Sequence, residues 1–131
     1  MNKSTTLLTG IFLMGLSVGL GAFGAHALEK LLEARGRANT WDLAVHYQMI
    51  HGLSLLIIGL LSDKKIKWFD FSSLALTAGV LCFSGSLYMI CLTEIVFPLV
   101  LITPLGGGLL IVGWACLFIA VLKKYKSNEP S

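Results

Sequence analysis

Charged residues are scarce in this chain. Lysine, arginine, aspartate and glutamate make up 13% of its 131 residues, whereas hydrophobic residues make up 56% and the mean hydropathy is +0.82. Soluble domains carry about 25% charged residues, so this composition excludes an ordinary soluble protein. Several apolar stretches reach the roughly 20 residues that a helix needs to cross a bilayer. The sequence predicts a single integral membrane domain over residues 1–131, which crosses the cell membrane several times.

The basic residues are poorly placed for binding nucleic acid. The formal net charge is +3, but all ten lysines and arginines fall in expected loops and tails. A nucleic-acid site needs these residues clustered on one folded face. We therefore expect the lipid bilayer as a partner and no nucleic acid.

Cysteine is rare, and the common catalytic motifs are missing. Cys82, Cys91 and Cys116 all lie in apolar stretches, and the first two stand about 13 Å apart along one helix, which excludes a disulfide between them. No zinc-protease, nucleophile-elbow or phosphate-loop motif occurs, and the three glycines at 106–108 are not followed by Lys-Ser or Lys-Thr. No two histidines share a helix face as metal ligands would. We expect no catalytic residue, no metal and no cofactor.

Four apolar segments predict an all-α bundle of four transmembrane helices, over about 5–27, 41–61, 71–93 and 104–123. A short amphipathic stretch, residues 28–39, separates the first two. The first segment also has the A-x-A form of a signal-peptide site, at Ala25 to Ala27, but its apolar core is longer than usual and three more segments follow. Thr40 and Thr103 are the expected N-caps of the second and fourth helices. Residues 95–102 form either an interfacial turn or a first segment kinked at Pro104.

The distribution of basic residues predicts the orientation of the bundle. One side carries Lys3, Lys64, Lys65, Lys67, Lys123, Lys124 and Lys126, and the other carries only Lys30, Arg35 and Arg37. Cytoplasmic loops are enriched in lysine and arginine. The sequence therefore places both termini in the cytoplasm.

Small residues form smooth stripes on the expected helices. At 100° per residue, Gly15, Gly19, Ala22 and His26 share one face of the first helix, and Ser17, Gly21 and Gly24 lie nearly opposite. Small residues let helix backbones approach closely in lipid. We expect the first helix to be packed on both faces, and the candidate packing positions are Gly15, Gly19, Gly21, Gly24, Gly79 and Gly85.

Polar side chains gather in the half of the membrane away from the termini. Gln48 and His51 lie about 10 and 15 Å into the second helix, where polar groups are costly unless they face the bundle interior. We expect a shared polar pocket formed by His26, Tyr47, Gln48, His51, Ser84, Ser86, Tyr88 and Thr103, with His26 as its lid. Two interpretations of His51 stay open. It is either a structural imidazole bonded to Tyr88 or a serine, or a group that binds a ligand or handles protons.

Four ordered motifs carry a resemblance to a known family. They are GAFGAH at 21–26, YQMIHGL at 47–53, FSGSLY at 83–88 and TPLGG at 103–107, followed by Gly113-Trp114. With these motifs the chain resembles the small four-span membrane proteins called domain of unknown function 423. The resemblance covers nearly the whole chain and implies a four-helix membrane bundle. It brings no activity, cofactor or catalytic residue to carry over.

Three classes of function remain for such a chain. The favoured one is a small-ligand binding or permeation module that uses the polar pocket, in a homo-oligomer because four short helices enclose little volume. An accessory subunit or assembly factor would instead use the smooth helix faces to hold a membrane partner. An enzyme acting on a lipid or quinone is the third class and is less favoured, since catalytic motifs are missing.

Overall fold

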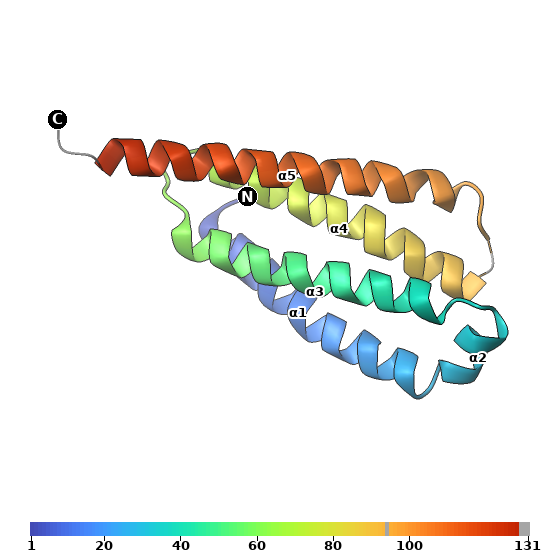
Figure 1. Cartoon of the computed structure of the whole chain (residues 1–131). Helices are drawn as coiled ribbons and strands as arrows, with labels where there is room; N and C mark the ends of the chain where they lie inside the picture. Colours follow the sequence, from blue (N-terminus) through green and yellow to red (C-terminus); the bar gives the residue numbers. More distant parts are fainter. Residues whose placement is uncertain (94, 129–131) are drawn as a thin grey trace.

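The described part of the chain forms four long helices and one short helix. A computed structural model describes residues 1–93 and 95–128, with the side chains described as far as residue 126. The helices are α1 (Lys3–Ala25), α2 (Glu29–Ala34), α3 (Ala38–Leu61), α4 (Trp68–Thr93) and α5 (Leu99–Asn128). All but α2 are long and apolar enough to cross a membrane. The start of α1 and the end of α5 lie at the end of the bundle that holds the α3–α4 connection, and α2 lies at the opposite end (Figure 1). The predicted four-helix membrane fold is confirmed.

The helix boundaries differ from the predicted ones by a few residues. Asn2 caps α1, because its side-chain oxygen accepts a hydrogen bond from the Thr5 amide at 2.9 Å. Thr40 is not a cap, since α3 already begins at Ala38. The last helix begins at Leu99, and Pro104 lies inside it. Proline in the sixth helical position lacks the amide that would donate to the Val100 carbonyl, but the helix continues through it.

The four long helices are arranged in a row rather than a closed bundle. The most extensive contacts join α4 to α5 and α1 to α3, and α3 also packs on α4. No comparable contact joins α3 to α5 in the part of the chain that the structure describes. In Figure 1, α4 lies between α3 and α5 and behind them.

Close helix approaches occur at glycines on the α1–α3 and α4–α5 contacts. A Cβ built on Gly10 would stand 2.9 Å from the Gly52 carbonyl oxygen, and one on Gly79 would stand 3.0 Å from the Leu110 amide nitrogen. The Ser72 hydroxyl donates to the Gly113 carbonyl at 2.8 Å across the α4–α5 contact. Small residues thus bring these backbones together, as is usual for helices in lipid.

Only one of the two smooth faces of α1 is covered. Gly24 packs against the indole of Trp41, and Gly21 lies against Val45. Gly15 and Gly19, in contrast, have no heavy atom within 4 Å of a built Cβ, and the same is true of Gly85 on α4. The expected packing of α1 on both faces is not found within the chain. The reason is that α3 is the one long helix that packs extensively on α1, so the opposite stripe faces outward.

Candidate functional site

Three of the polar residues expected to line a pocket instead join helices through buried hydrogen bonds. Gln48, which is 3% exposed, donates to the Leu13 carbonyl of α1 at 3.0 Å and accepts from the Tyr88 hydroxyl of α4 at 3.1 Å. The Ser84 hydroxyl donates to the Ala44 carbonyl at 2.8 Å. These side chains use their hydrogen-bonding groups on one another and on the backbone.

A further polar contact links α4 to α5. The hydroxyl oxygens of Ser86 and Thr103 lie 2.7 Å apart. No buried side-chain nitrogen or oxygen among the described residues lacks a hydrogen-bond partner. Unpaired polar groups would be costly in a lipid environment, so this pattern is typical of structural bonds between membrane helices.

His26 is not brought to the other polar residues. It lies at the C-terminus of α1, where its side chain is exposed on the outward stripe of that helix. It lines none of the hollows that His51 lines, among the residues that the structure describes. The expected lid over a shared pocket is therefore not formed, because the face of α1 that carries His26 is turned away from α3.

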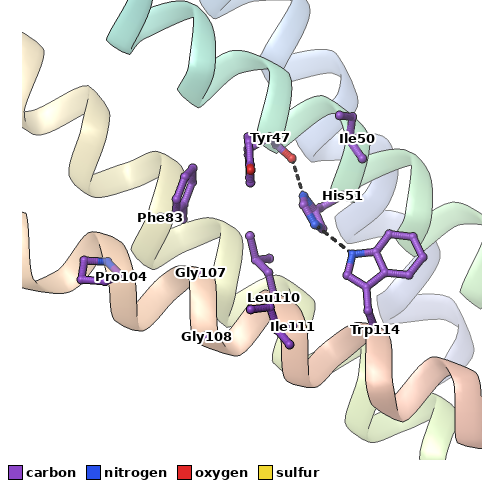
Figure 2. Close-up of a pocket in the computed structure, with 10 residues that line it drawn as sticks. All are labelled: Tyr47, Ile50, His51, Phe83, Pro104, Gly107, Gly108, Leu110, Ile111 and Trp114. Carbon is purple, nitrogen blue, oxygen red and sulfur yellow. Dashed lines mark hydrogen bonds between the residues drawn. The ribbon is translucent and has the colours of Figure 1, made fainter.

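His51 forms a bridge between α3 and α5. Its Nδ1 lies 2.7 Å from the carbonyl oxygen of Tyr47, and its Nε2 lies 3.2 Å from the indole nitrogen of Trp114 (Figure 2). An indole N–H can only donate, so Nε2 must accept, and the proton must be on Nδ1, which donates to the Tyr47 carbonyl. The ring is neutral in this arrangement. The bond to Trp114 replaces the expected bonds to Tyr88 or a serine.

A groove opens beside this bridge, between α3 and α5 and over α4. Its volume is about 700 Å³, within the usual range for small-molecule sites. Figure 2 shows Tyr47, Ile50 and His51 of α3 on one side, Phe83 of α4, and on the other side the α5 residues Pro104, Gly107, Gly108, Leu110, Ile111 and Trp114.

The groove is apolar and is exposed near the middle of the helices. Ile50 is 51% exposed, Ile111 is 72% exposed and Trp114 is 45% exposed, although all three lie well inside helices long enough to span the bilayer. The rings of Tyr47 of α3 and Phe83 of α4 are stacked, with their centroids 4.4 Å apart. Gly107 and Gly108 contribute only backbone to the α5 side of the groove, between Pro104 and the larger side chains that follow. The groove therefore opens on the side of the helices, at a distance from their ends.

Only some of the residues of the predicted polar pocket lie at the observed groove. Tyr47 and His51 line the groove, and Thr103 lines a neighbouring hollow. Phe83, Pro104 and Trp114 also line the groove and are absent from the predicted pocket, although the resemblance motifs contain them. The position of Trp114 in the middle of an apolar segment could have indicated the site, because tryptophan in membrane helices is more common at the interfaces.

Comparisons with known proteins identify the family. A family model described as protein of unknown function, DUF423, matches residues 20–107, more than half of the chain. This chain belongs to the DUF423 family. A UPF0382 membrane protein of Staphylococcus haemolyticus is 44% identical to it over 117 residues, which cover 89% of this chain and 94% of the relative. YwdK of Bacillus subtilis, another UPF0382 membrane protein, is 40% identical over 110 residues, covering 82% and 88%. No solved structure matches the chain.

The DUF423 match and the structure agree on the class of protein. The bacterial relatives are named as membrane proteins, and four helices of this chain are able to span a bilayer. This DUF423 protein is a multi-pass protein of the cell membrane. The matched region contains the α3 and α4 walls of the groove and ends at Gly107, before Trp114.

Proposed function

We propose that this DUF423 protein binds a lipid-soluble molecule that enters the α3–α5 groove sideways from the lipid. The observation that carries the proposal is an apolar groove of about 700 Å³ that is exposed near the middle of the helices. The groove lies inside a single chain, so a ligand does not require an oligomer to complete its site. The outward face of α1, which carries Gly15 and Gly19, offers a surface on which a second copy or a protein partner can pack.

The arrangement of polar groups favours binding over permeation. Gln48, Ser84 and Ser86, which could have lined a polar path, are bonded to other helices. It also favours binding over catalysis, because both ring nitrogens of His51 already have partners. The ligand we expect is therefore a lipid-soluble molecule held mainly by apolar contact.

A glycine of the groove allows a direct test. A Cβ built on Gly108 meets no heavy atom within 4 Å, so Gly108→Leu fills part of the groove without a clash at its Cβ. Gly19→Leu is the matched control, since Gly19 has the same open surroundings on α1, away from the groove. Both variants and the unmodified protein are purified in mild detergent and examined by native mass spectrometry, with extraction of bound molecules.

The expected result is a small molecule retained by the unmodified protein and by Gly19→Leu, and lost from Gly108→Leu. Equal retention by all three proteins would place the ligand elsewhere, and no retained molecule at all would refute the proposal. A protein partner retained in stoichiometric amount, in place of a small molecule, would support the accessory-subunit alternative instead.

A further inference from the structure

The groove continues toward the α2 end of the bundle. A second hollow of about 530 Å³ lies between the start of α3, the end of α4 and the start of α5. Phe83 and Pro104 line both hollows, so the two adjoin along the same side of the protein. Leu43, Leu87 and Val100 continue the apolar lining.

Arg37 is the one charged residue that lines this second hollow, among the described residues. Its backbone is held firmly, because its amide donates to the Leu32 carbonyl at 2.8 Å and its carbonyl accepts from the Trp41 amide at 3.0 Å. Its guanidinium forms no hydrogen bond or ion pair with another described residue. The nearby Arg35 differs, since it donates to the Cys91 carbonyl at 2.8 Å and to the Leu92 carbonyl.

Two features beside Arg37 also favour an anion. Thr40 lines the same hollow one turn further along α3 and carries a hydroxyl donor. The first turn of α3 receives no side-chain cap, so its backbone N–H groups add positive potential at this end of the helix. A positive group at the mouth of an apolar groove is complementary to a molecule with an anionic head and an apolar tail.

The length of the groove matches such a molecule in a membrane. Arg37 and His51 are 14 positions apart in the sequence, which corresponds to about 21 Å along α3. One leaflet with its head groups is about 20 to 22 Å thick, half of the whole bilayer. A lipid with its head at Arg37 therefore extends its chain along the groove toward the His51–Trp114 bridge.

We propose that the occupant of the groove is an anionic phospholipid, with its phosphate at Arg37 and Thr40 and an acyl chain between α3 and α5. This inference rests on the proposed function and names the class of ligand. It applies to either orientation of the chain in the membrane, because the site needs one leaflet only.

The test compares two lipids on delipidated protein. Native mass spectrometry measures the binding of phosphatidylglycerol, which is anionic, and phosphatidylcholine, which has no net charge. The variant is Arg37→Gln, and the matched control is Lys30→Gln, which removes a positive charge at the same end of the bundle from a residue that does not line the hollow. Thermal unfolding of each variant in detergent verifies that it is folded.

We expect the unmodified protein and Lys30→Gln to prefer phosphatidylglycerol. Arg37→Gln should bind this lipid about tenfold more weakly, the loss expected for one charge-assisted hydrogen bond, and Arg37→Lys should recover part of the preference. Glycerol phosphate, the head group alone, should not compete at millimolar concentration. Competition by it would indicate a free-anion site and overturn the lipid assignment.

The outcomes separate this inference from the proposed function. Equal binding of the two lipids, blocked by Gly108→Leu and unaffected by Arg37→Gln, would leave the groove as a site for apolar molecules but refute the anionic head group. Binding that neither Gly108→Leu nor Arg37→Gln changes would refute both. A protein helix retained in the groove in place of lipid would also overturn the assignment.

Discussion

Three consecutive glycines of α5 should respond differently to the same substitution. A Cβ built on Gly106 would stand within 3 Å of backbone atoms of Cys82 and Phe83 on α4. A Cβ on Gly107 would meet only the Phe83 ring, at 3.8 Å, and a Cβ on Gly108 would meet no heavy atom within 4 Å. Replacing each glycine by alanine in turn therefore tests how α5 is rotated against α4.

The magnitudes follow from two opposing effects. Alanine in place of glycine stabilises a helix interior by about 0.5 to 1 kcal/mol, and this gain is common to all three positions. Overpacking costs about 1 to 3 kcal/mol, and it applies to Gly106 because the opposing atoms are backbone and cannot rotate away. Gly108→Ala and Gly107→Ala should thus raise the free energy of unfolding slightly. Gly106→Ala should lower it relative to Gly108→Ala by about 1 to 3 kcal/mol.

Unfolding in mixed detergent micelles, followed by circular dichroism, measures these differences. The comparison of neighbouring positions cancels effects of purification and detergent. Equal changes at all three positions, or a larger loss at Gly108 than at Gly106, would show that another face of α5 contacts α4. The groove described above would then be wrongly placed as well.

Three further predictions address the rest of the bundle. Gly24→Ala should lower thermal stability, because the new Cβ collides with a buried indole, whereas Gly19→Ala should raise it slightly, as at the equally open Gly108; similar losses would mean that both faces of α1 are packed. Tyr88→Phe removes the hydroxyl that donates to the α3 glutamine and should cost about 0.5 to 2 kcal/mol. Tyr47→Phe is its control, since that hydroxyl bonds to no described residue, and equal effects would contradict the network. A cysteine introduced at Lys30 should react with an impermeant thiol reagent added outside the cell, and labelling only after lysis would reverse the predicted orientation.

The sequence alone was sufficient for the number of spanning helices, because that property depends on local composition. A backbone in lipid must satisfy its hydrogen bonds within the segment, so each apolar stretch of sufficient length becomes a helix. The observed helix boundaries differ from the predicted ones where the local sequence allowed more than one start for a helix. Pro104 was compatible both with a helix start and with a position inside a longer helix, and α5 contacts α4 on both sides of it, at Thr103 and at Gly106.

The faces that the helices turn to one another were decided only by the tertiary structure. Two opposite stripes of α1 are equally smooth, and nothing within that helix indicates that Gly24 meets Trp41 while Gly19 faces outward. The depth of Gln48 and His51 in the membrane could be read from their positions along α3. That Gln48 belongs to a buried hydrogen-bond network and His51 to the groove could not be read from the sequence. This difference depends on contacts with Tyr88 of α4 and Trp114 of α5, which are far from α3 in the chain.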